Sequence, residues 1–231
     1  MITDPLGVQH SLSSFCNPLP LATFATSSYP SLKLTYFPLA AREEAARLAF
    51  HIGGVPFVDE RITFEEFGRR QPTLPVLEVD GKVIAQAHAV LRYVGNRSGL
   101  YPTVNVIVAL QIDELFCLMD ALYNMLGLAN HATDPARQVA TFAELEGETI
   151  PKFLNQLDKR TAHYSSGPYA IGARLTVADL AIAGLVNFLA SGAIAAVPTT
   201  IVDPFANILK IRDLVHAHPK VVEWQQTHAD H

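Results

Sequence analysis

The stretch Thr73–Val94 constrains the fold most, because it predicts a strand, a tight turn, a second strand and a helix in quick succession. Asp80-Gly81 is a dipeptide that favours a two-residue hairpin turn with positive φ. It separates two short β-rich runs, Val76–Val79 and Lys82–Ala85. Pro75 cannot donate a hydrogen bond to a ladder, so we place it at a strand start, where a tight bend can hold a cis peptide bond. The proline bend, the hairpin and the helix start converge on one corner, which we predict to be a binding site.

The residues before this stretch complete an α/β unit. Alternation over Leu32–Phe37 predicts a strand. The apolar spacing over Ala41–Ile52 predicts a helix that ends at Gly53-Gly54. Val55–Asp59 follows as a second strand, and Arg61–Gln71 as a charged connection that is irregular or briefly helical. Together with the hairpin and its helix, these elements predict an α/β first half with parallel and antiparallel strand pairs.

The second half of the chain is predicted to be all-helical. Gly99–Pro102 interrupts the pattern, so we expect an α/β domain over residues 31–101 and an all-helical domain over residues 104–231. Pro135 starts one helix, which Pro151 is expected to kink. Thr176 and Asp179 form a Thr-x-x-Asp capping box at the start of another helix, which is apolar enough to lie at the centre of a bundle.

Charge and cysteine content argue against several classes of protein. The chain has 231 residues, a net charge of −5 and a pI near 6.0, without a basic run, so nucleic acid is not an expected partner. Cys16 and Cys117 are the only cysteines, which indicates no disulfide framework and a reducing, cytoplasmic compartment. Histidines near the C-terminus lack an acidic or cysteine partner at ligand spacing, so no metal site is predicted.

Two segments require a decision about targeting. Residues 1–30 contain no Lys or Arg, which fits neither a secretory nor a mitochondrial signal, and we expect a disordered leader. Leu180–Val197 carries no formal charge and approaches the length of a membrane span. Asn187 and Ser191 interrupt it and the capping box precedes it, so a buried core helix is the better interpretation and no membrane partner is expected.

Five sequence words, in this order, resemble those of the cytosolic glutathione transferases. The Tyr-Phe pair at the end of the first strand is most similar to the sigma class, which uses a catalytic tyrosine and has glutathione-dependent isomerases among its relatives. The resemblance implies a thioredoxin-like domain, a helical domain, glutathione as co-substrate, a homodimer and a role in detoxification. The words are LTYFPLAAREEAARLAF (Leu34–Phe50), LPVLEVDG (Leu74–Gly81), QAHAVLRYV (Gln86–Val94), LTVADLAI (Leu175–Ile182) and HPKVVEW (His218–Trp224).

The resemblance also implies roles for individual residues. Tyr36 matches the catalytic tyrosine, and Arg42 an arginine that supports the active site. Leu74, ahead of Pro75, matches the residue whose backbone pairs with the cysteinyl part of glutathione. Gln86 matches the side chain that binds the γ-glutamyl group at a helix start, where backbone amides favour a carboxylate. Read without the family, the same residues also fit a half-buried strand tyrosine, an exposed helix charge and a polar residue near a helix start.

The chain departs from the family pattern around this site. Phe67 and Arg70 are the residues available where the family often has Trp and Lys. Ala87 stands where a serine usually holds the γ-glutamyl carboxylate. The backbone amide remains, but the lost hydroxyl bond to a charged group costs about 1.5–3 kcal/mol of binding.

The first long helix carries a further departure. Cys117 aligns with an aspartate that usually meets the glutamyl amine across the dimer, although Asp113 or Asp120 could serve with a shift of one turn. We expect the electrophile between the domains, against the helix that bears these three residues. The main alternative is a non-catalytic binding or structural protein on the same fold, as the lens crystallins are. A thiol–disulfide enzyme is disfavoured, because no Cys-x-x-Cys pair lies near the first helix.

Overall fold

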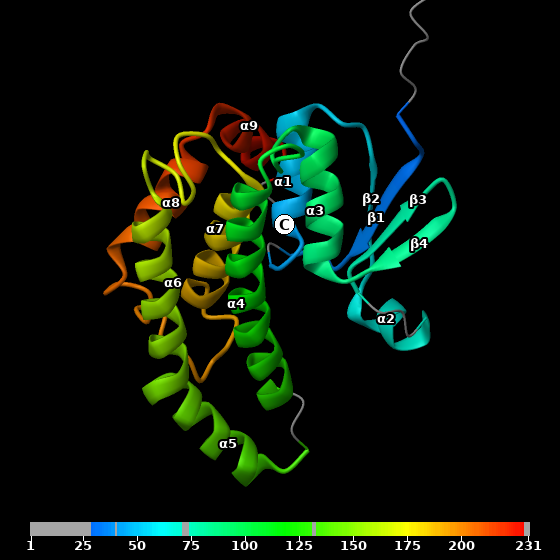
Figure 1. Ribbon diagram of the computed structural model, residues 1–231. Helices are drawn as coiled ribbons and strands as arrows, with labels where there is room; N and C mark the ends of the chain where they lie inside the picture. The colour runs from blue at the N-terminus through cyan, green and yellow to red at the C-terminus, as the bar shows by residue number, and fades with distance from the viewer. Residues whose placement is uncertain (1–28, 40, 71–73, 131–132, 229–231) are drawn as a thin grey trace, which may run out of the picture.

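The computed structural model describes residues 29–39, 41–70, 74–130 and 133–228. The predicted leader, residues 1–30, lies outside the described residues except for its last two. The described part of the chain forms an N-terminal thioredoxin-like domain followed by a helical domain (Figure 1).

Four strands of the described chain form one mixed sheet in the order β2-β1-β3-β4. β1 (Leu32–Tyr36) pairs in parallel with β2 (Val58–Arg61) and antiparallel with β3 (Val76–Val79). β4 (Lys82–Ala85) pairs antiparallel with β3. The predicted hairpin is confirmed: Asp80 has φ 47° and Gly81 has φ 79°, both in the left-handed region that this turn requires.

Two helices lie between the sheet and the helical domain (Figure 1). They are α1 (Glu44–Gly53) and α3 (Ala87–Ser98), which contact each other. Gly54, with φ 63°, ends α1 as the sequence predicts. The short α2 (Phe64–Arg70) occupies the connection between β2 and β3.

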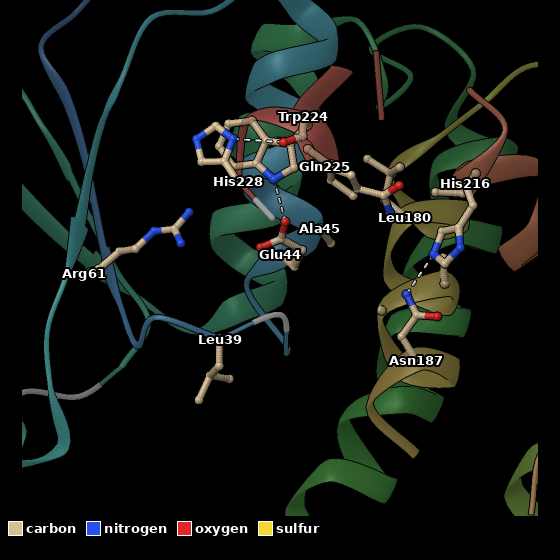
Figure 2. Close-up of a pocket in the computed structure, with 14 residues that line it drawn as sticks. Leu39, Glu44, Ala45, Arg61, Leu180, Asn187, His216, Trp224, Gln225 and His228 are labelled. Carbon is tan, nitrogen blue, oxygen red and sulfur yellow. Dashed lines mark hydrogen bonds between the residues drawn. The ribbon is translucent and has the colours of Figure 1, made fainter. Parts of the chain in front are cut away.

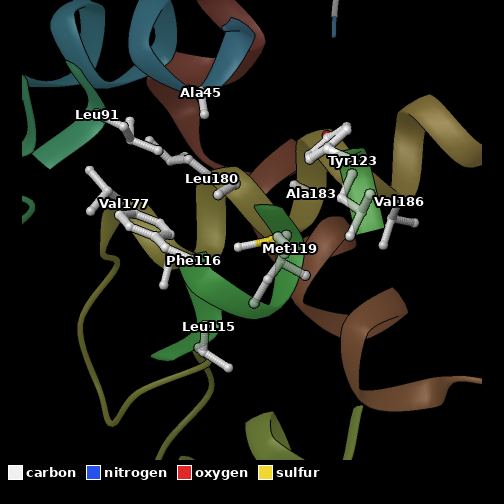
Figure 3. Packing of buried hydrophobic residues seen from close by; sticks show 14 of the residues in the cluster. Ala45, Leu91, Leu115, Phe116, Met119, Tyr123, Val177, Leu180, Ala183 and Val186 are labelled. Atoms are coloured by element: carbon white, nitrogen blue, oxygen red, sulfur yellow. The ribbon is translucent and has the colours of Figure 1, made fainter. Parts of the chain in front are cut away.

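The helical domain is built around α7 (Val177–Ala190), which contacts α1, α4 and α8. Figure 3 shows its side chains Leu180, Ala183 and Val186 among buried residues of α1 and α4. Because α7 is buried along most of its length, it is apolar on nearly all faces. The other elements are α4 (Val106–Asn130), α5 (Pro135–Glu144), the π-helical segment η2 (Leu145–Thr149), α6 (Ile150–Tyr164), α8 (Ala206–His216) and α9 (Pro219–Thr227).

The capping box at the start of α7 is confirmed. The buried Asp179 carboxylate accepts hydrogen bonds from Thr176 N at 2.7 Å, Thr176 Oγ1 at 2.9 Å and Ala170 N at 2.7 Å. Asp179 therefore fixes both the helix start and the preceding loop. In the described chain no helix is both long and apolar enough to cross a bilayer, α7 included.

Two local predictions need correction. The second strand is Val58–Arg61 and not Val55–Asp59, because the partners of Lys33–Tyr36 on β1 begin at Val58. Pro151 does not simply kink a helix; the chain passes through η2 immediately before it. A proline clashes with the carbonyl four residues earlier, here Gly147 within η2, and a π-turn accommodates the altered hydrogen bonding.

Candidate functional site

Three segments meet at one end of the sheet. Thr35 of β1 pairs with Val76 of β3, and Val76 pairs with Ala85 of β4. Tyr36 continues past Thr35, while the Leu74–Pro75 peptide precedes Val76 and Gln86 follows Ala85. The register therefore brings the residues of the predicted corner side by side. The Leu74–Pro75 bond is cis, as expected for this bend.

Tyr36 lines a cavity of about 390 Å³ between the two domains. The α/β domain contributes Phe37, Arg42 and Leu74, and the helical domain contributes mainly apolar and aromatic side chains. The rings of Phe37 and Phe64 stack at 4.4 Å on the α/β side. An apolar cavity with few polar groups is the usual form of a small-molecule site. Its helical wall includes Tyr123, Leu126, Phe142, Phe188 and Ile194.

Tyr36 remains a neutral hydroxyl near neutral pH. Burial, followed by the nearby Glu43 carboxyl, raises the pKa of Tyr36 above its usual value, and Arg42 and Arg47 partly oppose this. The Arg47 guanidinium lies 5.9 Å from the centre of the Tyr36 ring. A neutral phenol is a hydrogen-bond donor, which suits stabilisation of an anion rather than removal of a proton.

Arg42 lies in the cavity and stacks over the Tyr123 ring, 4.4 Å from its centre. Arg42 therefore lines the cavity, whereas its local sequence is equally compatible with an exposed charge at the start of a helix. The buried Tyr123 has a raised pKa, mainly through burial, so it too stays a neutral phenol. Arg42 thus places a positive charge between two neutral phenols at the domain interface.

Gln86 and Ala87 form the start of α3. Gln86 is exposed and adopts φ 82°, a left-handed conformation that costs a non-glycine residue roughly 1–3 kcal/mol. Ala87 is buried at the first helical position, with no side-chain hydroxyl. Strained backbone of this kind concentrates at ligand-binding positions, and it lies beside the cis proline in this chain.

Phe67 and Arg70 lie on α2. The Phe67 ring meets Phe37 edge-on at 5.3 Å, so Phe67 supports the aromatic wall but does not line the cavity. Arg70 is the last residue of α2, and its side chain lies outside the described part of the structure.

The interdomain cavity lies against α4, the helix on which the electrophile is predicted to bind. α4 contributes Tyr123, Leu126, Gly127 and Asn130 to the wall of the cavity. Asp113 accepts hydrogen bonds from Arg92 at 2.6 Å and Tyr101 at 3.1 Å. Asp120 lies 2.7 Å from Nδ1 of the buried His88, and Cys117 is exposed. None of these three residues is among those that line the cavity, which contacts α4 at its C-terminal turns.

Sequence reasoning missed the distant aromatic residues and Glu43. Phe142 and Phe188 come from α5 and α7, and no local pattern places them opposite Tyr36. Glu43 is only 1% exposed, although it sits in a charged run that reads as a solvated helix start. Its Oε1 has no hydrogen-bond partner within the described residues. No local sequence signal distinguishes Glu43 from a solvated carboxylate at a helix start.

A thioredoxin-like sheet, a cis proline facing a strand-end tyrosine and an interdomain cavity against a helical bundle together define the glutathione-transferase fold. A sequence model of the glutathione S-transferase C-terminal domain matches residues 120–228. The chain is 35% identical to Glutathione S-transferase 1 of Ascaris suum over 167 residues, which cover 66% of this chain and 77% of that relative. The chain therefore belongs to the glutathione S-transferase family, whose members use glutathione as co-substrate.

Two further similar proteins are named as prostaglandin synthases. The chain is 28% identical over 202 residues to the hematopoietic prostaglandin D synthase of Gallus gallus, covering 85% of this chain and 96% of that one. The solved structure of prostaglandin synthase D of Nilaparvata lugens superposes with a TM-score of 0.74 at 28% identity, covering 85% of this chain and 98% of that one.

Proposed function

We propose that this chain is a sigma-like, tyrosine-type glutathione transferase, in which the Tyr36 hydroxyl activates the glutathione thiol for attack on small hydrophobic electrophiles. The observation that carries the proposal is the position of Tyr36: a neutral phenol that lines the interdomain cavity and continues β1 beside the cis Leu74–Pro75 bend. The same chemistry supports isomerisation as well as conjugation.

In this proposal the start of α3 and the proline bend hold the tripeptide. The Leu74 backbone pairs with the cysteinyl part, and Gln86 with the backbone amide of Ala87 binds the γ-glutamyl end. Phe67 and Arg70 remain proposed glutathione-binding residues, at the positions where the family often has Trp and Lys. The geometry that supports the roles of Leu74 and Gln86 is the strand register, which brings both to one end of the sheet beside Tyr36.

Tyr36 then donates a hydrogen bond to the glutathione sulfur. A thiol with a pKa near 8.5 is only about 3% ionised at pH 7. A hydrogen bond to the anion contributes roughly 1.5–3 kcal/mol, which lowers the thiol pKa by about one to two units. The thiol proton leaves to solvent, and the sulfur electron pair forms the bond to the electrophile. Arg42 adds positive charge beside Tyr36 and favours the same anion.

The cavity supports the assignment of the second substrate class. Its walls are mainly aromatic and aliphatic, and Arg42 is its charged lining residue. An apolar electrophile would bind there by burial of its surface, with its polar group directed toward Arg42 or Tyr123. Detoxification of such compounds is the role that we propose.

A non-catalytic protein on the same fold is the alternative, and Ala87 is the observation that favours it. The lost hydroxyl weakens binding of the γ-glutamyl carboxylate by about tenfold or more. Cys117, at the position where the family usually has an aspartate, also supports the non-catalytic alternative. If both contacts are absent, the cavity could bind apolar compounds without activating glutathione.

The test is an ultraviolet difference titration that follows thiolate absorbance of bound glutathione against pH. We expect the bound thiol to ionise about one to two pH units below free glutathione in the wild-type protein, and not in Tyr36→Phe. Tyr169→Phe, at a loop tyrosine outside the cavity, is the matched control. If glutathione does not bind at millimolar concentration, or if Tyr36→Phe leaves the thiolate and the activity unchanged, the proposal is wrong.

We also propose a homodimer, a cytoplasmic location and domain limits at residues 31–101 and 104–231. The large side chains Val106, Ile107 and Leu110 are 73%, 60% and 64% exposed at the start of α4, which supports an interface on this helix. The domain limits are supported by α3 ending at Ser98 and α4 beginning at Val106. The low cysteine content supports the location.

A further inference from the structure

We propose that a second cavity, which shares Leu39 with the Tyr36 cavity, binds small carboxylic acids with an apolar body. It encloses about 250 Å³ between α1, α7, α8 and α9 (Figure 2). This volume is slightly below the roughly 300–1,000 Å³ of drug-sized sites, so it suits a small ligand. Nothing in the proposed transferase chemistry uses this space.

Small and aliphatic residues create the hollow. Ala45 and Leu48 of α1 face Leu180, Ala183 and Gly184 of α7 across it. Among the described residues, a β-carbon built on Gly184 would meet only the Ala41 carbonyl oxygen, at 3.8 Å, which is ordinary van der Waals contact, so there is open space beside Gly184. These residues provide an apolar floor that favours a hydrocarbon or aryl group.

The charged groups around the cavity favour an anion. Glu44 is already occupied: Oε1 accepts from Trp224 Nε1 at 2.7 Å and Oε2 from Arg47 at 3.3 Å. Arg61 donates from Nε to Asp59 at 2.7 Å, but Asp59 also accepts from Arg47 at 3.0 Å. One carboxylate thus serves two guanidinium groups. Within the described part of the chain, the terminal nitrogens of Arg61 have no hydrogen-bond partner, and Figure 2 shows this side chain reaching toward Glu44 and Trp224.

α7 and α8 contribute a neutral polar pair to the cavity. Asn187 Nδ2 lies 2.9 Å from His216 Nε2, and burial lowers the pKa of His216, so this imidazole is neutral at physiological pH. A neutral imidazole that accepts at Nε2 carries its proton on Nδ1. A ligand whose carboxylate pairs with Arg61 and whose apolar part packs on α7 would therefore bind better than a cation or a purely apolar compound.

The chain contains a reporter for this cavity. Trp224 is its only tryptophan and lines the cavity, whereas the Tyr36 cavity has none. We would titrate the full chain with octanoate, and with 1-octanol as the neutral analogue, and follow fluorescence excited selectively at tryptophan. We expect a saturable change with octanoate and weaker binding of 1-octanol. The absence of a saturable change at millimolar octanoate would overturn the proposal.

Leu39 lines both cavities, so variants are needed to distinguish binding at this site from binding in the Tyr36 cavity. Arg61→Gln should weaken octanoate binding by about tenfold or more and leave 1-octanol unchanged, while Arg69→Gln on exposed α2 is the matched control. Gly184→Leu should fill the cavity and abolish binding, with Gly184→Ala as its control and circular dichroism as a check on folding. Unchanged octanoate affinity in Arg61→Gln, or in a folded Gly184→Leu, would show that the proposal is wrong.

Discussion

Glu43 gives the sharpest prediction about this protein, because it is a buried carboxyl with no adequate partner. Its side chain is 1% exposed, and Oε1 has no hydrogen-bond partner within the described residues. Arg47 is close but committed elsewhere: its guanidinium donates to Asp59, Glu44 and the carbonyl oxygens of Phe37 and Leu39. Burial therefore outweighs the opposing charges of Arg47 and Arg42 and raises the pKa of Glu43 from 4.5 to about 8.

A raised pKa in the folded state makes stability fall as pH rises. The folded protein holds the Glu43 proton more tightly than the unfolded chain, so the contribution is full below about pH 4.5 and is lost as pH rises through about 8. At about 1.36 kcal/mol for each pH unit, the difference amounts to at most about 5 kcal/mol. Glu43→Gln keeps the shape of the neutral acid and removes this dependence.

The assay is urea unfolding of wild-type protein and Glu43→Gln at about pH 5, 7 and 9. We expect the wild type to lose several kcal/mol more than the variant between about pH 5 and pH 9. Glu65→Gln, at an exposed position on α2, controls for the general effect of losing a carboxylate. If wild type and Glu43→Gln lose the same free energy over this range, then Glu43 is not the buried neutral acid inferred here.

Three further predictions test the site and the packing. Ala87→Ser should tighten glutathione binding by about tenfold or more, measured by calorimetry, because it supplies the missing hydroxyl to the γ-glutamyl carboxylate; equal affinity would mean that the hydroxyl cannot reach it. Asp179→Ala should lower the free energy of unfolding by at least about 3 kcal/mol in urea, since it leaves the buried donors of Thr176 and Ala170 unpaired. Gly95→Ala should cost about 1–3 kcal/mol, because its β-carbon would lie 2.5 Å from Val177 Cγ1; an unchanged melting temperature would contradict the close packing of α3 on α7.

Local chemistry was enough to predict most of the elements. The Asp80-Gly81 turn, the helix end at Gly54 and the capping box at Thr176 depend on residues within a few positions of one another, and each is found as predicted. The predicted bounds of a strand were wrong where its pairing partner lies far away in the chain. β2 begins at Val58 because β1 pairs with it there. The π-helical segment before Pro151 has a local cause, the clash of the proline ring with the Gly147 carbonyl, but the sequence pattern predicted only a kink.

The site divides in the same way. The sequence by itself determined that Pro75 and Gln86 meet, since a hairpin of fixed register forces them together. The place of Tyr36 beside them depends on the pairing of β1 with β3, whose strands are far apart in the chain. Only the tertiary structure decided which turns of α4 face the cavity, that Phe142 and Phe188 complete it, and that Glu43 is buried. Turn and cap preferences act through neighbouring backbone atoms and can be read locally. Burial and charge pairing depend on helices far apart in the chain, so they exist only once the two domains have packed together.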